Sequence, residues 1–132
     1  MEVDLAVLAD AANTTESGKI NILGIFDRFT LGPEFPASSP TFSIVVRIVG
    51  HPSETGTHQL LLQLADADGR EIAKFGGEFT AERKKTTAKP FRVPVILGAQ
   101  VNFPHPGEYS VDVLVDERWE TSIRLEVRKA SS

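Results

Sequence analysis

The sequence contains no cysteine among its 132 residues, and this absence removes several classes of function at once. Disulfide bonds, thiolate metal sites and cysteine nucleophiles are all excluded. The sequence also lacks a run of about 18 consecutive apolar residues, the length that a membrane-spanning helix requires. Its first residues are acidic, whereas a secretory signal peptide begins with positive charge. We therefore expect a soluble, cytoplasmic protein.

Positive charge is also scarce, because 14 Lys and Arg residues face 18 Asp and Glu residues and the net charge is −4. This sign disfavours a domain whose main task is to bind phosphate backbones. We expect no nucleic-acid partner and no membrane partner. The chain length suits one domain, which we place at residues 1–128, followed by a frayed tail at residues 129–132.

Alternation of apolar and polar residues recurs in eight segments and is clearest in the last two, residues 109–115 and 119–127. A period of two places one face of a strand in the core and the other in water. The pattern therefore predicts that Tyr109 and Trp119 both face the core. Residues 116–118 form a short link, which predicts a hairpin.

Two further hairpins are predicted. Residues 3–11 and 19–29 are joined by the polar loop NTTESG, and the strand that contains Leu60, Leu62 and Leu64 is followed by one through Ile72. Residues 41–49 are apolar on one face and half apolar on the other, which indicates a central strand. Residues 91–101 contain Pro94 and are predicted to form an edge or bulged strand, because proline cannot donate to a ladder.

Three connections are too long for hairpins, at residues 31–40, 79–90 and 102–107, and each contains proline. We expect them to carry the chain from one sheet to another. Tyr109 follows the last of them directly, in the position of a tyrosine corner whose hydroxyl bonds back to upstream backbone. The predicted fold is all-β, an eight-stranded antiparallel β-sandwich of Greek-key or immunoglobulin-like type, with a closed β-barrel as the alternative.

One segment, DADGRE at residues 66–71, begins like a calcium-binding loop. It then departs from that pattern, because Arg70 and Gly77 stand where further ligands belong. Asp68 and Gly69 are typical of a hairpin turn, and we interpret the segment as a turn.

The three histidines, His51, His58 and His105, lie beside loops without the spacing of a zinc site, and we expect them to be solvated. No catalytic, cofactor-binding or metal-binding residue is predicted, and we expect no enzyme activity. An enzyme of unfamiliar type that uses loop carboxylates and a histidine remains an alternative. For that reading, Asp or Glu and His side chains would have to converge in a pocket.

The only dense cluster of positive charge lies in the predicted connection at residues 79–90. It consists of Arg83, Lys84, Lys85 and Lys89. These residues form a tentative partner surface that could contact an acidic partner or phosphates. The alternative is an ordinary solvated loop, which charge runs of this kind usually form.

The opening of the sequence carries a specific string. Leu8-Ala9-Asp10, followed by GKINILGIFD at residues 18–27, resembles a family of small bacterial proteins known only as a domain of unknown function. The likeness continues through Phe35-Pro36, residues 66–69 and residues 107–109. The resemblance implies a stand-alone bacterial domain and brings no activity, cofactor or catalytic residue with it.

Within that string, residues 19–27 are apolar on both faces, and Gly24 permits a bulge or the close approach of another backbone. This pattern indicates either a strand buried on both faces, which we expect, or one whose outer face meets a partner. The leading functional hypothesis is a non-catalytic binding or structural module, with a protein partner or with self-association as a homodimer. A carbohydrate-binding module is a further alternative, by analogy of fold alone.

Overall fold

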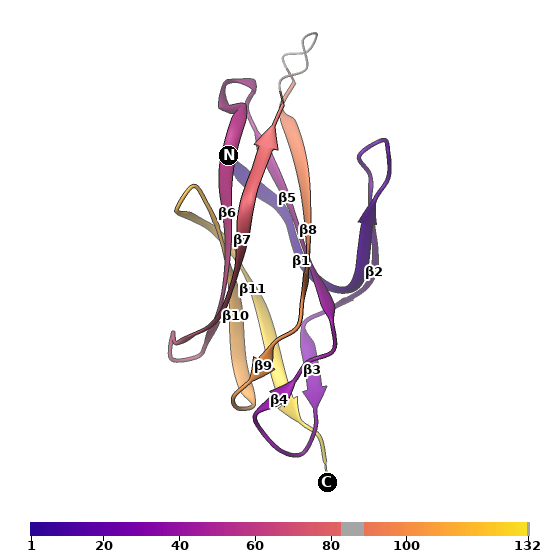
Figure 1. Cartoon of the computed structure of the whole chain (residues 1–132), viewed down its shortest axis with the longest axis vertical. Helices are drawn as coiled ribbons and strands as arrows, with labels where there is room; N and C mark the ends of the chain where they lie inside the picture. Colours follow the sequence, from indigo (N-terminus) through magenta and orange to yellow (C-terminus); the bar gives the residue numbers. More distant parts are fainter. Residues whose placement is uncertain (83–88, 132) are drawn as a thin grey trace.

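The computed structural model describes residues 1–82 and 89–131, which form two large β-sheets packed face to face and one short two-stranded sheet. Figure 1 shows the two sheets edge-on, with a hairpin standing outside them on the right. Both sheets have edge strands, so the fold is a sandwich and not a closed barrel. No helix in the described residues is long and apolar enough to cross a membrane.

The first sheet has the strand order β2-β1-β5-β8. Its strands are β1 (Glu2–Thr14), β2 (Ile20–Phe26), β5 (Phe42–Gly50) and β8 (Phe91–Ala99). The predicted central strand is β5, which pairs with β1 on one side and β8 on the other. The predicted edge strand is β8, where Pro94 lies opposite Arg47.

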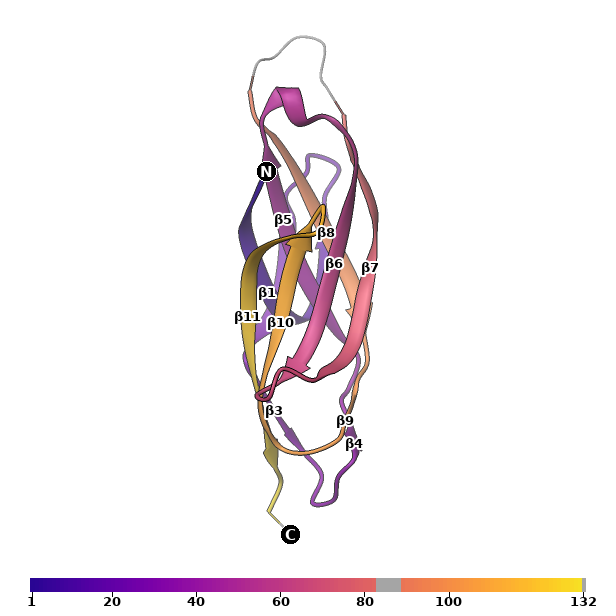
Figure 2. The ribbon, with the colours of Figure 1, turned by 90° about the vertical axis from the view of Figure 1, so that its left-hand side faces the viewer.

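The second sheet has the order β3-β11-β10-β6-β7 and faces the viewer in Figure 2. Its strands are β3 (Arg28–Leu31), β6 (Gly56–Asp66), β7 (Glu71–Ala81), β10 (Gly107–Val115) and β11 (Arg118–Lys129). All three predicted hairpins are present, as β1-β2, β6-β7 and β10-β11. β11 extends one residue past the boundary expected at 128, and Ala130 beyond it donates a backbone hydrogen bond to Leu31.

The eight predicted strands correspond to eight of the eleven strands in the described part of the chain. Two of the additional strands, β4 (Ala37–Ser38) and β9 (Asn102–Phe103), form a short pair of their own. The third, β3, arises because the predicted strand at residues 19–29 breaks at Asp27. β3 leaves the first sheet and pairs in parallel with β11, so the sandwich is not antiparallel throughout.

The three proline-bearing connections join strands of different sheets, as predicted. They link β3 to β5, β7 to β8 and β8 to β10. A short 3-10 helix, η1 (Pro52–Glu54), lies in a fourth crossing between β5 and β6. Proline suits these segments because it fixes φ and needs no ladder partner.

The core fills the space between the sheets with the inward residues of both. Its largest fully buried side chains include Phe103, Leu8, Ile44, Ile48, Leu62, Leu64 and Leu125. At the end where the chain changes sheets, aromatic rings dominate. The ring centroid of Phe29 lies 4.7 Å from that of Phe26, 5.3 Å from that of Phe42 and 6.0 Å from that of Phe103.

The predicted tyrosine corner is confirmed. The hydroxyl of buried Tyr109 donates a hydrogen bond of 2.6 Å to the backbone carbonyl of His105, four residues upstream. The phenol ring packs edge-on against Phe103 at 5.0 Å and stacks on the His105 ring at 5.6 Å. The bond thus fixes the connection from β9 to β10 against the core.

The prediction that Trp119 faces the core is wrong. The pairing of β10 with β11 shifts register between Val113 and Leu114, so that Val113 lies opposite Thr121 but Leu114 lies opposite Trp119. At this shift β11 has one residue more than β10. The additional residue moves the Trp119 indole to the outer face of the second sheet, where Trp119 is 62% exposed. The turn before it has two residues, Asp116 and Glu117, both at positive φ, as a type I′ turn requires.

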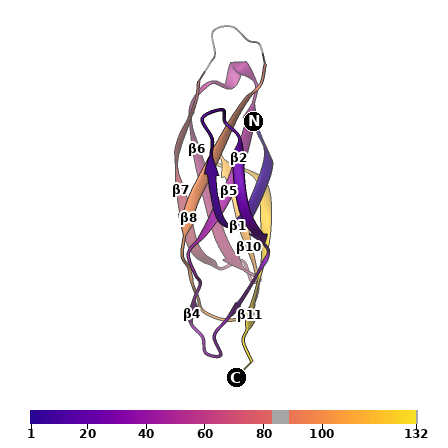
Figure 3. The same ribbon diagram turned by 90° about the vertical axis from the view of Figure 1, so that its right-hand side faces the viewer.

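The β1-β2 hairpin lies outside the sandwich, in front of β5 and β8 in Figure 3. The pairing of β1 with β5 ends at Ala9, while its pairing with β2 continues to Thr14. Figure 1 shows β1 bending sharply where it leaves β5. Asp10 and Gly24 face each other at this bend, and Gly24 has φ +70° with the Asp10 side chain where its Cβ would be. The two parts of the N-terminal string, Leu8-Ala9-Asp10 and residues 18–27, are therefore in contact.

We expect Tyr109→Phe to lower the free energy of unfolding by about 1 kcal/mol, because the substitution removes a buried hydrogen bond and leaves the His105 carbonyl without it. Urea unfolding monitored by circular dichroism measures the change. An unchanged midpoint and slope would show that the hydroxyl does not fix this connection.

A second prediction concerns the bend. Gly24→Ala puts an alanine in the left-handed backbone region, which lowers the free energy of unfolding by about 1–2 kcal/mol. The substitution also places a methyl group against the Asp10 side chain. Gly18→Ala is the matched control, because Gly18 has φ +84° but open space around its Cβ position. Urea unfolding should show a larger loss of stability for Gly24→Ala than for Gly18→Ala. Adding Asp10→Gly to Gly24→Ala should remove this difference. Equal losses for both alanine variants would contradict a role for Asp10.

Candidate functional site

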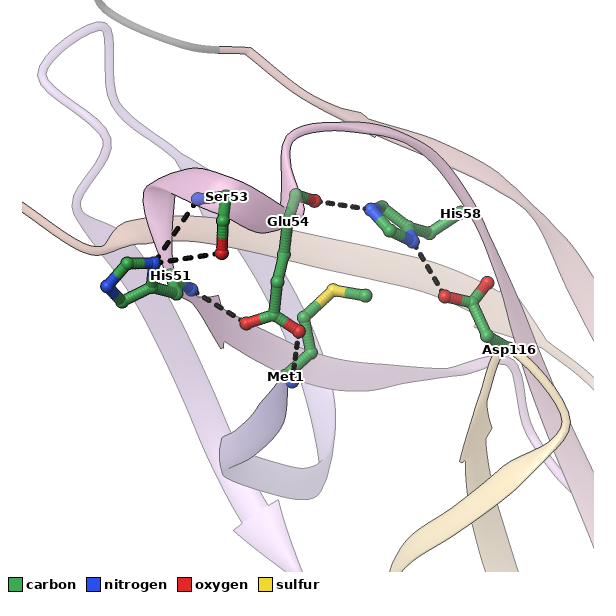
Figure 4. Close-up of polar contacts among 6 residues, drawn as sticks. All are labelled: Met1, His51, Ser53, Glu54, His58 and Asp116. Atoms are coloured by element: carbon green, nitrogen blue, oxygen red, sulfur yellow. Dashed lines mark hydrogen bonds and ion pairs between the residues drawn. The ribbon is translucent and has the colours of Figure 1, made fainter.

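A polar cluster surrounds η1 at the end of the sandwich where β5 crosses to β6 (Figure 4). The backbone N–H of His51 donates to Glu54 Oε1 at 2.9 Å, and the amino group of Met1 pairs with Glu54 Oε2 at 2.6 Å. The Ser53 backbone N–H donates to His51 Nδ1 at 3.3 Å. His51 and Glu54 thereby cap the helix at its first turn.

His58 lies on β6 beside this helix and has both ring nitrogens engaged. Nδ1 lies 2.6 Å from Asp116 Oδ2, and Nε2 lies 2.6 Å from the Glu54 carbonyl oxygen. The carbonyl oxygen and an ionised carboxylate can only accept, so the protonated ring, with a hydrogen on each nitrogen, satisfies both contacts. The expectation of a solvated histidine is wrong here, because the side chain is only 16% exposed.

Burial of the ring lowers the pKa of His58. The bonds to Asp116 and to the Glu54 carbonyl raise the pKa by more than burial lowers it, so the pKa lies above its ordinary value. A backbone hydrogen bond from Gln59 and the bond from His58 hold the pKa of Asp116 below its usual range. The pair therefore ties the β10-β11 turn to β6. A histidine with both nitrogens occupied by protein acceptors has no free nitrogen to accept a proton from a substrate.

The DADGRE segment forms the turn that the sequence suggested. Asp66 Oδ1 accepts backbone hydrogen bonds from Asp68 at 3.0 Å and Arg70 at 2.9 Å, and Gly69 has φ +82°. The backbone bonds from Arg70 and Asp68 hold the pKa of Asp66 below its usual value, even though burial acts to raise it. Among the described residues, no group of three or more His, Asp or Glu side chains could hold a metal ion.

β2 exposes apolar side chains. Leu23 is 71% exposed and Ile25 is 63% exposed, and among the described residues only they and Trp119 are large hydrophobic side chains left this open. The expectation that this strand is buried on both faces is therefore wrong. β2 pairs only with β1 and forms one edge of its sheet.

A hollow of about 730 Å³ lies beside the tip of the β1-β2 hairpin. Its charged lining consists of Lys19, Arg47, Lys89 and Arg92, with Glu82 as the only acid among the described lining residues. Of the predicted partner surface, Lys89 lies here, whereas Arg83, Lys84 and Lys85 lie outside the described residues. We call this hollow the cationic groove.

Sequence reasoning missed Arg47 and Arg92. Both occupy outward positions of otherwise apolar strands, a signal that was present in the sequence. Their proximity depends on the register of β5 with β8, which places Arg47 opposite Pro94 and Val49 opposite Arg92. The two arginines are therefore diagonal neighbours on one face. No local pattern in the sequence gives that register.

Residues 4–128 match the sequence model of a family described as a family of unknown function (DUF6941). No curated protein matches the chain. One similar solved structure is a glycosyl hydrolase family 2 member from Bacteroides cellulosilyticus, with 12% identity and a TM-score of 0.49, and the match covers 95% of this chain and 15% of that one. Another is an immunoglobulin-like protein from Pseudomonas aeruginosa, with 15% identity, a TM-score of 0.39 and coverage of 96% and 95%.

The ion pair of His58 with Asp116 should stabilise the folded protein only within a limited range of pH. The contribution of His58 is fully present below the ordinary histidine pKa of about 6.5 and is lost as the pH rises through the raised value. The contribution of Asp116 is present above about pH 4 and is lost as the pH falls through its lowered value. Urea unfolding should therefore show a stability loss of about 1 kcal/mol between about pH 5.5 and pH 9 that depends on the pair.

Asp116→Asn should remove this pair-dependent loss, because asparagine tolerates positive φ and retains an acceptor for Gln59 but carries no charge. Glu117→Gln is the matched control, since it removes the same charge from the adjacent turn residue. Identical pH profiles for the two variants would show that the pair contributes nothing.

Proposed function

The chain belongs to this family of unknown function, DUF6941, and we propose that it is a non-catalytic interaction module that pairs with a second copy of itself through the free edge of β2. The observation that carries the proposal is the exposure of Leu23 and Ile25 on an edge strand. An edge strand presents unpaired backbone donors and acceptors that another strand can use. Exposed apolar side chains beside them add surface for burial.

The sequence of β2 is suited to pairing with itself. Ile20–Phe26 contains no charged residue, so two copies bring no like charges together. In an antiparallel pair centred on Leu23, Lys19 of each copy lies opposite Asp27 of the other.

The polar clusters support a non-catalytic role. A general base needs a nitrogen or carboxylate within reach of a substrate, whereas both nitrogens of His58 and the inner oxygen of Asp66 are bound to protein groups. In the part of the chain that the structure describes, every buried side-chain nitrogen and oxygen has a hydrogen-bond partner. These groups are explained by turns and crossings.

Carbohydrate binding is the second candidate, because Trp119 is exposed on the outer face of the second sheet. Its indole N–H donates to Ser122 Oγ at 2.9 Å, and Ser122 in turn donates to Asp112 at 2.6 Å. One ring held by its neighbours offers less stacking surface than a row of aromatic side chains. We therefore rank this function below self-association.

Sedimentation equilibrium of the full chain tests the proposal. We expect a weak dimer that forms over the micromolar to millimolar range, since a single strand edge buries less than the roughly 1,200 Å² of a stable interface. Leu23→Asp should abolish it, because the substitution places two carboxylates face to face. Trp119→Asp is the matched control and should leave the dimer intact.

The charges at the ends of β2 provide a sharper arm. Lys19→Asp and Asp27→Lys should each weaken the dimer, and the double variant should restore it, because the two opposite charges are exchanged. A wild-type chain that stays monomeric throughout this range would refute the proposal. Failure of the double variant to recover would refute the register.

A further inference from the structure

The cationic groove concentrates positive charge on a chain whose net charge is −4. Four basic side chains and one acidic side chain occur among its described lining residues, whereas acids outnumber bases in the sequence as a whole. Phe91 and Val93 also belong to the lining, but they lie on the opposite face of β8 from Arg92 and do not share the surface of the arginines. A local reversal of sign is typical of a binding site for an anion.

The positive charge comes from separate elements. Lys19 is at the tip of the β1-β2 hairpin, Arg47 is on β5 and Arg92 is on β8. Figures 1 and 3 show the hairpin standing over the outer side of β5 and β8, and all three residues line the groove.

The two arginines differ in their present contacts. The Nε of Arg47 donates to Asp4 at 2.8 Å, and this bond holds the arginine side chain in place. Arg92 is exposed and, among the described contacts, makes no side-chain hydrogen bond or ion pair. Of the two arginines, Arg92 is therefore the one better placed to bind a new carboxylate.

We propose that the cationic groove binds an extended acidic peptide segment of a partner protein, with its carboxylates on the basic side chains. A single phosphate group is held best by donors that converge on one point, such as a helix N-terminus or a paired arginine fork. Here Arg47 and Arg92 are neighbours on one face, while Lys19 and Lys89 come from the hairpin tip and from the connection before β8. Basic groups from separate elements can each meet a different carboxylate of an extended chain. The volume lies within the range of about 300–1,000 Å³ that ligand sites occupy.

This proposal does not depend on self-association. Lys19 is common to the groove and to the end of β2, so it stays unchanged in the peptide experiment. The monomeric Leu23→Asp variant should bind the peptide at least as tightly as the wild type. Loss of the dimer with retained peptide binding, or the reverse, therefore separates the two proposals.

The test is an NMR titration of the isotope-labelled full chain with the capped peptide Glu-Glu-Leu-Glu-Glu-Leu. We expect the amide signals of Gly18, Thr80 and Val93 to shift, and the affinity to fall as salt rises. Arg92→Gln should weaken binding at least threefold. Arg124→Gln is the matched control, because it removes the same charge from the exposed face of the other sheet and should leave the affinity unchanged.

Three outcomes would overturn the proposal. The first is equal weakening by Arg92→Gln and Arg124→Gln, which would indicate unspecific attraction. The second is a set of shifted signals away from the groove, a readout that uses the wild-type chain and needs no variant to fold. The third is tighter binding of inorganic tripolyphosphate, or of a single-stranded DNA oligonucleotide, than of the peptide, which would assign the groove to phosphate.

Discussion

The change of sheet at Asp27 is the constraint on which the rest of the structure depends. Phe26 ends a strand of the first sheet and Phe29 lies in the second, and their ring centroids are 4.7 Å apart. Both rings contact Phe42, and Phe29 also contacts Phe103. Because the chain passes between the sheets at the point where these rings pack, the apolar contact sets how the two layers meet. The Asp27 carbonyl then accepts a hydrogen bond from Glu126 at 2.9 Å and begins the parallel pairing of β3 with β11.

The same change of sheet explains why an apolar edge is left outside. Once β3 has joined the second sheet, β2 retains only β1 as a neighbour. β1 in turn leaves β5 after Ala9, and the hairpin continues alone past the bend at Asp10 and Gly24. A strand in this position cannot be buried on both faces, whatever its composition. Leu23 and Ile25 are therefore surplus to the core, which is the physical reason for proposing that they meet a partner.

Much of the fold could be predicted because alternation and turn chemistry are local. The three hairpins, the edge position of Pro94 and the bond of Tyr109 all followed from neighbouring residues. The failures have non-local causes. A single extra residue of β11 opposite Leu114 moved Trp119 from the inner to the outer face of its sheet. Apolar residues on both faces of β2 did not show whether that strand is buried or exposed. The burial and double hydrogen bonding of His58 depend on Asp116, 58 residues away in the sequence.

The hairpin also connects the two proposed surfaces. Its outer strand carries Leu23 and Ile25, while its tip contributes Lys19 to the cationic groove. In the proposed dimer, Lys19 would lie opposite Asp27 of the second copy, which would draw one positive charge away from the groove. Thermodynamic linkage then requires that a peptide which uses Lys19 weakens the dimer by the same factor by which the dimer weakens the peptide. Arg92 and Lys89 lie outside this exchange, so the coupling is limited to the share of peptide affinity that Lys19 supplies. An acidic partner would thus favour the monomer without any change in the sandwich itself.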